Sequence, residues 1–545
     1  MATKFMFDNK KISLPGAYST VQMSAKQLPS TAVFGKILVI DTGSGAGYGG
    51  GSGIAGVLAN GKDAIYSFND PQEFRNYVKG GIWSVLGEKL FNPVVGRAGT
   101  PQLLFTRACA TTPATMTFSP TGGGANGGSV VMQIQDEGLI GNGVENTSNK
   151  LTKGYAFTFH AGVDDINKFF VKFWLGTFKG LHTDGLPFDE ISANDTEPLL
   201  LAQSIEFNNI DDFINWCSVD SVFNTYFKVL SSTKNGTGAI TAADLTLISG
   251  NKLATGGTET YSPTHLDTVF EHIKDLEFTF ILADKSGSDA TGTQNTSILN
   301  HILTQAKYQK FLVVGGGDDS AHWTQTGGSI PTAEYFDSDR VIIVHGAAKK
   351  TSLIAGSGFR VFNSLYKAAC VLGRGCGLAP QVPWTYKNVG IDGEVHNLSE
   401  KERTLALDKG VLCTYYNTTL KKYIVQQAVN TLQNNNWMVN AAGKSYSVQL
   451  NNIVAQVNKE LILDAEIELL ADESGVNRNT LSEAYLRDWI VGKLQQKSVS
   501  ETQDNYLISF SKVVVERQGD AYFGTYEMEI NTEINKVFFT GRVYI

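Results

Sequence analysis

Proline, cysteine and charge are all scarce in this 545-residue chain. The 13 prolines argue against a proline-rich linker protein, and together with 56 glycines they favour extended sheet with glycine turns. Charged residues make up 18% of the chain, below the usual quarter, whereas the 42% of hydrophobic residues is typical of globular proteins. This combination indicates a surface that is largely neutral and polar, or that is covered by other subunits. The net charge of −8 argues against a sequence-independent nucleic-acid binder.

The sequence also contains no recognised motif for a metal site or for redox chemistry. The five cysteines contain no C-x-x-C pair, and their odd number predicts buried, reduced thiols in a cytoplasmic setting; they are Cys109, Cys217, Cys370, Cys376 and Cys413. The eight histidines are scattered, and His265 and His272 lack the spacing of metal ligands. No recognised hydrolase or zinc-protease motif is present. We therefore expect no catalytic residues, no metal and no cofactor.

The start of the chain lacks the apolar core of a signal peptide. No apolar stretch approaches the roughly 20 residues that span a bilayer. We therefore expect a protein that is made and assembled in the cytoplasm, without direct insertion into a membrane.

Glycine-rich stretches raise the question of a nucleotide site. Gly45, Gly47 and Gly50 have the spacing G-x-G-x-x-G after the apolar run Ile37–Ile40. The glycines continue through Gly53, however, and so many of them disfavour the helix that must follow at once to bind a phosphate. Residues 56–62 also read G-x-x-x-x-G-K, but Asp63 stands where a P-loop needs Ser or Thr. A surface loop is the better interpretation of both stretches. Residues 315–319 (GGGDD) could hold a cation through two carboxylates, but a turn with solvated aspartates is the better interpretation there.

The hydrophobic pattern predicts an α/β domain. Continuous apolar runs at residues 37–40, 103–107, 278–282, 311–314 and 341–344 are typical of strands in a sheet that is covered on both faces. A helix is expected after Asp70, which is placed as an N-cap with Pro71 and Glu73 behind it. Another is expected over residues 264–273, where Leu266, Val269, Phe270 and Ile273 share one face.

The predicted fold is multidomain, α/β and α+β. A central α/β domain comprises residues 30–118 and 258–385, and a β-rich domain of residues 119–257 is inserted into it. A C-terminal α+β domain follows at residues 386–535. It contains one helix with an apolar stripe from Leu450 to Leu461 and a second helix that opens with a capping box at residues 480–483.

The two ends of the chain are predicted to be extended. Pro15 and Gly16 interrupt an N-terminal arm within residues 1–29. Residues 526–534 alternate strictly, with Tyr526, Met528, Ile530 and Ile534 on one face and Glu527, Glu529 and Glu533 on the other. A second strand, residues 537–545, ends the chain. Either these last two strands pair with each other, or neighbouring subunits complete their edges by strand addition.

The order of several short motifs resembles that of the contractile tail sheath proteins of bacteriophages and related injection machines. Residues 14–18 (LPGAY) are similar to the P-G-V-Y opening of those chains, and residues 136–142 (DEGLIGN) resemble their P-G-x-W-G-N turn. The stretches GLAPQVPWT (377–385) and LSEKERTLALDKGVLCTYYN (398–417) resemble two further segments of the family. The inserted domain matches no family motif.

This resemblance implies a structural subunit that polymerises as a helical cylinder around an inner tube and contracts to drive the tube through a cell envelope. The implied partners are identical sheath subunits and the tail tube, baseplate and tail terminator proteins, without nucleic acid, in a virion tail that is assembled in the host cytoplasm. It also implies that the terminal strands join a neighbour's C-terminal sheet, with hinges near residues 22–30 and 519–524. The expected subunit-interface residues are Ile12, Leu14, Tyr18, Val21, Tyr526, Met528, Ile530, Ile534, Val537, Phe539, Val543 and Ile545.

Two other functions remain open from the sequence. The glycine spacings allow a nucleotide-binding α/β enzyme, and the neutral polar composition allows a lattice-forming surface protein. The lack of a secretion signal at the start of this sequence counts against the second. The acidic strand face of Glu527, Glu529 and Glu533 is either simply solvated or meets a basic surface of the tube or baseplate.

Overall fold

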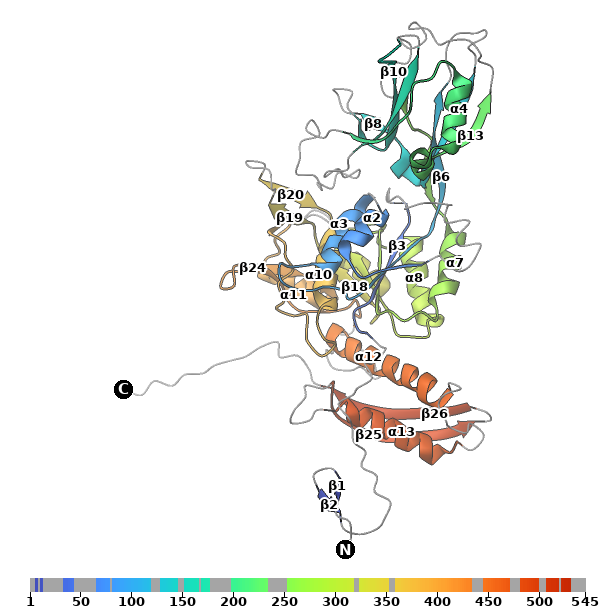
Figure 1. The fold of residues 1–545 in the computed structure, drawn as a ribbon. Coiled ribbons are helices and arrows are strands. Elements are labelled where there is room, and N and C mark those ends of the chain that lie inside the picture. The colour runs from blue at the N-terminus through green and yellow to red at the C-terminus, as the bar shows by residue number, and fades with distance from the viewer. Residues whose placement is uncertain are drawn as a thin grey trace.

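The computed structural model shows three domains in a row: an inserted domain, a central α/β domain and a C-terminal domain (Figure 1). The structure describes residues 5–7, 10–12, 33–43, 65–78, 81–118, 128–145, 151–165, 168–176, 198–233, 252–317, 323–351, 358–433, 445–470, 481–498, 506–518 and 521–530.

The central domain is built on a seven-stranded sheet with the order β22-β18-β17-β16-β3-β5-β4. All neighbours are parallel except β4, which runs antiparallel to β5 at one edge. The strands are β3 (Ile37–Asp41), β4 (Tyr66–Phe68), β5 (Leu103–Arg107), β16 (Phe280–Ala283), β17 (Phe311–Gly315), β18 (Val341–Val344) and β22 (Val411–Leu412). Every residue of β3 and β16 is buried, as their continuous apolar sequences predict.

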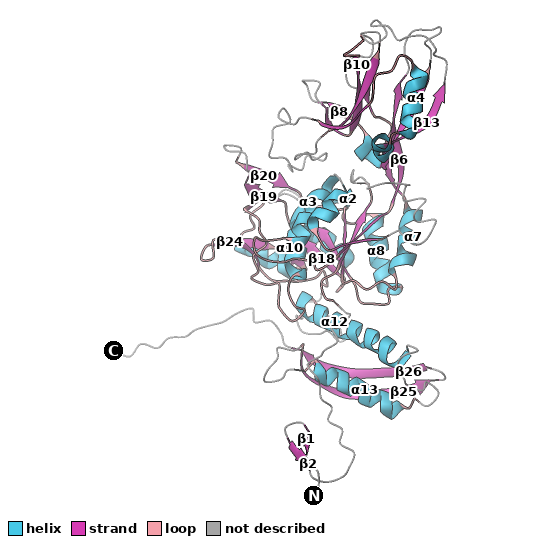
Figure 2. Ribbon diagram, viewed as in Figure 1, coloured by secondary structure: helices cyan, strands magenta, loops and turns pink. Residues whose placement is uncertain are grey.

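Helices cover both faces of this sheet. On one side α2 (Pro71–Val78) and α3 (Gly81–Phe91) pack with α10 (Ser364–Cys376), and on the other lie α7 (Pro263–Ile273) and α8 (Thr293–Thr304) (Figure 2). The predicted N-cap of α2 is confirmed, because Asp70 accepts hydrogen bonds from the backbone N–H groups of Gln72 and Glu73. The predicted apolar face of α7 is also confirmed, since Leu266, Val269, Phe270 and Ile273 are all buried.

The central domain extends well beyond residue 385. After α9 (Ser329–Phe336), the chain forms β19 (Ala348–Thr351), β20 (Phe359–Phe362), β21 (Gly393–Glu394), α11 (Glu400–Asp408), β23 (Thr414–Asn417) and β24 (Lys422–Val425). Strand β22 lies at the edge of the large sheet, and Val389, Cys413 and Val425 belong to its core. The boundary expected at 385/386 therefore falls inside this core, because a two-residue strand leaves no recognisable pattern in the sequence.

The inserted domain is a sandwich of two four-stranded sheets with the orders β12-β11-β10-β14 and β13-β7-β6-β15. Its strands are β6 (Cys109–Phe118), β7 (Ser129–Glu137), β10 (Tyr155–Ala161), β11 (Phe169–Leu175), β12 (Leu199–Gln203), β13 (Phe227–Thr233), β14 (Lys252–Leu253) and β15 (Thr258–Tyr261). A small hairpin, β8 (Val144–Glu145) and β9 (Leu151–Lys153), lies beside them. Stacked and edge-on phenylalanines fill the space between the sheets.

Two features of this domain differ from expectation. It begins at Cys109 and ends at Tyr261, not at 119 and 257, because β6 continues directly from β5 and pairs with β15 up to Cys109↔Tyr261. It also contains two helices, α4 (Ile210–Val219) and α5 (Ser221–Tyr226), where only strands were expected. Asn209 and Asp220 cap them by accepting backbone hydrogen bonds, a signal that the sequence analysis missed.

The 136–142 motif ties the inserted domain together. Asp136 accepts a hydrogen bond from the hydroxyl of Tyr155, and residues 138–141 form a 3₁₀ turn. The side chain of Asn142 both donates to the carbonyl of Gly257 and accepts from its N–H, each at 2.8 Å. The motif therefore fixes the segment that leads back to the central domain.

The C-terminal domain consists of α12 (Val448–Ala465), α13 (Glu483–Gln496) and a hairpin of β25 (Leu507–Gln518) and β26 (Ala521–Ile530). A π-helical turn, Glu466–Leu470, follows α12. The helix expected after residues 480–483 is present, but its N-cap is Ser482, which accepts from the N–H of Tyr485. Its glutamate does not close a capping box, because Glu483 accepts from the N–H of Arg517.

Strand pairing at the chain ends corrects two expectations. Strand β26 starts at Ala521 and pairs with β25, a partner that the sequence analysis did not identify. The hinge expected at 519–524 therefore overlaps the start of β26, where residues 521–524 pair with residues 515–518. At the other end, β2 (Lys10–Ile12) pairs with β1 (Phe5–Phe7) of the same chain. Leu14, Tyr18, Val21, Ile534, Val537, Phe539, Val543 and Ile545 lie outside the described residues.

A buried charge cluster joins the central and inserted domains. The guanidinium of Arg107, at the end of β5, lies 2.5 Å from Asp41 and 2.7 Å from Glu259, and all three side chains are fully buried. Glu259 belongs to β15 and also accepts from the N–H of Leu139 in the 3₁₀ turn. Beside this cluster, Asp284 accepts from the backbone and hydroxyl of Thr42. The ends of β3 and β5 are thus connected to the insertion by charge.

We expect Arg107→Met to lower the free energy of unfolding by about 3–5 kcal/mol, because Asp41 and Glu259 would stay buried without a countercharge. Urea unfolding would measure this loss. Arg75→Met is the control, since Arg75 pairs with Glu88 at 3.0 Å on the surface and should cost less than about 1 kcal/mol. Equal losses in the two variants would contradict the assignment of the cluster.

The same cluster predicts a pH dependence of stability. Burial, and then the charge of Asp41, raise the pKa of Asp284 to about 6. The carboxyl of an unfolded chain titrates near ~4, so the folded state holds an extra proton between these values. This contribution to stability is present at low pH and is lost as the pH rises through 6. Asp284→Asn should remove about 1 kcal/mol of the difference in unfolding free energy between pH 5 and pH 7. If urea titrations gave the same difference in unfolding free energy for Asp284→Asn and the unaltered chain, the raised pKa of Asp284 would be refuted.

Candidate assembly surfaces

The β25–β26 hairpin has outer edges to which further strands could be added. Within the described residues, β26 pairs with β25 alone over its ten residues. Among the residues that the structure describes, the partners of β25 outside the hairpin lie near its two ends, where Leu507 N–H donates to the carbonyl of Lys497 and Arg517 N–H donates to Glu483. Unpaired edges of this length are ready templates for another chain, and isolated proteins avoid them. The hairpin is therefore a candidate surface for strand addition.

One face of this hairpin is covered by the chain itself. Tyr526, Met528 and Ile530 pack against a small core that α12 and α13 share with the hairpin. The hydroxyl of Tyr526 donates to Asn458 of α12. The sequence analysis expected these three side chains at a subunit interface, but they face the chain's own core. A partner strand would therefore contact the backbone edge of β26, and these side chains would support the strand from within.

The opposite face is exposed and acidic. Glu527 accepts from Lys512 at 2.7 Å and from Ser511 at 3.3 Å, and Glu529 accepts from Ser509 at 2.6 Å. The hydrogen bond from Lys512 lowers the pKa of Glu527, which keeps the carboxylate ionised. The alternation predicted from the sequence is thus confirmed up to Ile530.

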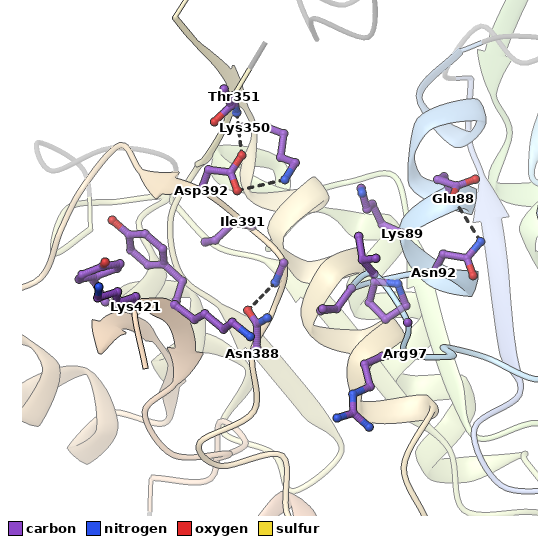
Figure 3. Close-up of a pocket in the computed structure, with 18 of the residues that line it drawn as sticks. Glu88, Lys89, Asn92, Arg97, Lys350, Thr351, Asn388, Ile391, Asp392 and Lys421 are labelled. Carbon is purple, nitrogen blue, oxygen red and sulfur yellow. Dashed lines mark hydrogen bonds and ion pairs between the residues drawn. The ribbon is translucent and has the colours of Figure 1, made fainter. Parts of the chain in front are cut away.

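A groove on the central domain forms a second candidate surface, with a volume of about 1040 Å³. Figure 3 shows the basic side chains Lys89, Arg97, Lys350 and Lys421 around it. Its walls come from the end of α3, the following loop at residues 92–98, the β19–β20 hairpin, residues 388–392 and the turn before β24. Four separate segments of the chain therefore meet here, because the end of α3 and the loop at residues 92–98 are continuous.

Two glycines shape the groove. Residues 94–97 form a turn in which Arg97 N–H donates to Val94 at 2.9 Å and Gly96 has φ +72°. This turn leaves Val95 fully exposed at its tip. Gly390 also has a positive φ of +73°, and a Cβ there would lie 2.2 Å from the carbonyl oxygen of Pro93. Only glycine allows the 388–392 segment to approach the 92–98 loop so closely.

Positive charge dominates the groove. Its lining contains five basic side chains and two acidic ones. Both acids already have basic partners, because Asp392 lies 3.0 Å from Lys350 and Glu88 lies 3.0 Å from Arg75. Within the described residues Lys89, Arg97, Lys421 and Lys422 have no ion-pair partner. The groove is therefore suited to a ligand or partner that carries carboxylates or other anions.

A buried serine and two histidines form the one arrangement that resembles catalytic chemistry in the described residues. The hydroxyl of Ser329 lies 2.7 Å from Nδ1 of His345, whose Nε2 lies 3.3 Å from His396. Burial holds the pKa of His345 well below its usual value. Ser329 is fully buried, however, and its oxygen also accepts from the N–H of Gly317. Without access for a substrate, this network is a structural link between α9 and β18.

The cysteines are buried and free, as expected. Burial raises the pKa of Cys370 to about 11 and that of Cys413 to about 12, so these thiols stay protonated. Among the described residues, no group of three or more His, Cys, Asp or Glu side chains is arranged to hold a metal ion. No helix in the described part is both long and apolar enough to cross a bilayer. The glycine spacings at 45–50 and 56–62 lie outside the described residues.

Comparison with known proteins gives matches in structure but none in sequence. No protein-family model and no curated protein matches the sequence. The crystal structure of a sheath tail protein from Listeria innocua matches with a TM-score of 0.50 at 14% identity, over 91% of this chain and 95% of that one. A sheath tail protein from Desulfitobacterium hafniense matches with a TM-score of 0.53 at 13% identity, over 95% of this chain and all of that one. The chain has the fold of sheath tail proteins, which confirms the predicted resemblance at the level of the fold.

The sequence analysis missed the groove entirely. Its residues are scattered from Glu88 to Tyr423, and each of them reads as an ordinary surface residue. One local signal was available, since Lys421 and Lys422 follow the turn residues 417–420 and precede an apolar strand. Asn417 accepts from the N–H of Leu420 and so defines that turn.

Gly390→Ala should destabilise the protein by about 2 kcal/mol or more beyond Gly96→Ala. Both positions have nearly the same positive φ, so the backbone penalty cancels between them. A methyl group at Gly390 meets Pro93, whereas nothing lies within 4 Å of one at Gly96. Equal urea midpoints for the two variants would show that the close approach is not real.

Proposed function

We propose that this chain is the structural subunit of a contractile tail sheath. It polymerises as a helical cylinder around an inner tube and contracts to drive the tube through a cell envelope. The observation that carries the proposal is the β25–β26 sheet, in a chain with the fold of sheath tail proteins. In the described part of the chain this sheet has two strands, and the outer edge of β26 has no partner strand. A hairpin of this kind gains most from strands that another copy supplies.

The missing strands come from the ends of neighbouring copies in this proposal. Residues 537–545 would supply nine residues of strand, which would span about 30 Å at ~3.4 Å per residue. Strand β26 has ten residues and so offers about 34 Å of edge. Residues 11–24 supply the second donor segment in this proposal. The length of the C-terminal donor therefore matches that of the acceptor edge, and its apolar residues Val537, Phe539, Val543 and Ile545 lie at alternating positions of the sequence.

Such links explain how a cylinder contracts without falling apart. Each donated strand is covalently part of one subunit and is held by main-chain hydrogen bonds to the next, while the bodies are free to rotate and slide. The extended state is then metastable, and contraction releases free energy as contacts between neighbouring bodies grow. The role is structural, not enzymatic. Its partners are identical subunits together with the tube, baseplate and terminator proteins of a tail that is assembled in the cytoplasm of the host.

Deletion of residues 11–24 or 537–545 should leave a folded, soluble chain that no longer forms cylinders. The folded body depends on the three domain cores and not on these segments, so the circular dichroism and urea midpoint should match those of the full chain. Negative-stain electron microscopy of the purified proteins measures cylinder formation.

The matched controls keep the chain length and replace each segment by an equal number of glycines and serines. They should fail to form cylinders like the deletions, because they remove the capacity for strand pairing without shortening the reach. Normal cylinders from the deleted chains would refute the exchange of strands. A full-length chain that never forms cylinders, with or without its tube, would refute the sheath function itself.

A further inference from the structure

The groove on the central domain combines its unpaired cations with exposed apolar side chains. Val95 is 101% exposed, Phe359 is 59% exposed and Tyr416 is 47% exposed. Three large apolar residues at the rim of one groove form a patch of the kind that marks an interaction site. With Lys89, Arg97, Lys421 and Lys422 beside it, the groove suits a partner surface that is both acidic and apolar.

The outer face of the β25–β26 hairpin has that composition. Pairing places Glu516 opposite Phe523 and Val514 opposite Thr525, so these side chains share the exposed face with Glu527 and Glu529. Val514 is 46% exposed and Phe523 is 51% exposed. Lys512 offsets one of the three carboxylates, since it lies 2.7 Å from Glu527. The face therefore remains acidic around an apolar centre.

We infer that the groove of one copy receives the outer face of the β25–β26 hairpin of a neighbouring copy. This inference rests on the proposed function and deepens it. Each copy carries a net charge of −8, so two copies repel unless basic and acidic regions meet directly. A contact between two different surfaces of the same chain is heterologous, and such contacts generate rings or open helices.

The groove cannot be filled by the hairpin of its own chain. Helix α12 belongs both to the large core, through Val448 and Ala455, and to the small core, through Ile453 and Val457. It holds the hairpin beyond the end of the central domain, away from β19, β20 and β24 (Figure 1). The contact is also compatible with strand exchange, because exchange uses the edges of the hairpin and docking uses its face.

Charge reversal provides the first test. The double change Lys421→Glu and Lys422→Glu should raise the protein concentration needed for cylinder formation at least tenfold, because like charges would face each other across the contact. Adding Glu516→Lys and Glu529→Lys to the same chain should restore assembly to within about threefold of the original. Lys401→Glu is the matched control, since Lys401 is exposed on α11 outside the groove and should assemble normally.

Cross-linking identifies the occupant of the groove. Cylinders are grown from an equal mixture of ¹⁵N-labelled and unlabelled full-length chains and treated with a carbodiimide, which joins lysines to carboxylates in direct contact. Peptides that join Lys89, Lys421 or Lys422 to Glu516, Glu527 or Glu529 and carry one label each can only come from two different copies. The inference requires such mixed peptides.

These experiments distinguish a failure of the docking contact from a failure of the proposed sheath function. The inference is wrong if the Lys421→Glu, Lys422→Glu variant forms cylinders normally and no mixed peptides join the two surfaces. That result would not contradict the sheath function. Cross-links from the groove to a tube protein instead would overturn it as well. If the unaltered chain formed no cylinders, the docking contact and the sheath function would both be refuted.

Discussion

Helix α12 is part of two cores at once, and the arrangement of the whole chain depends on it. Its early turns pack in the large core of the central domain and its middle packs against α13 and the hairpin. Buried charges strengthen the junction: Lys459 lies 3.0 Å from Glu277 and donates to the carbonyl of Val33 at 3.0 Å, and Lys36 pairs with the same glutamate. Breaking such contacts would leave charges buried without partners. The hairpin is therefore fixed to the central domain.

In the sheath proposed above, this fixed attachment determines where movement between copies would occur. If the hairpin moved on the body, a neighbour's strand bound to its edge could transmit no force to that body. In the proposed sheath, displacement between copies would fall on the connections outside the cores, because the hairpin and the body share α12. The two-stranded sheet is consistent with this division, since a hairpin packed on helices is stable enough to fold alone and still gains from added strands. Folding and assembly can then proceed in that order.

The parts of the fold that were predictable are those in which burial restricts the residue type. Strands β3, β5, β17 and β18 are covered on both faces, so they must be continuously apolar, and their limits were predicted to within one residue. The partner of β26 was not predictable in this way. Strand β25 is exposed along most of its length, carries bulges at two points and so shows no clean alternation. The groove was not predictable for a different reason, because it forms only where four segments that are distant in the sequence fold together.

The position of the inserted domain follows from the same logic of rigid units. The chain enters it through β6 and leaves through β15, which pair side by side directly above the ends of β5 and α7. An insertion at two adjacent strands leaves the order of the large sheet unchanged, and its own aromatic core makes it stable by itself. What the insertion must keep is its orientation, and Arg107 provides it by binding Asp41 on one domain and Glu259 on the other. A surface domain of almost any sequence could be carried in this way without disturbing the hairpin, the groove or the helix that holds them in register.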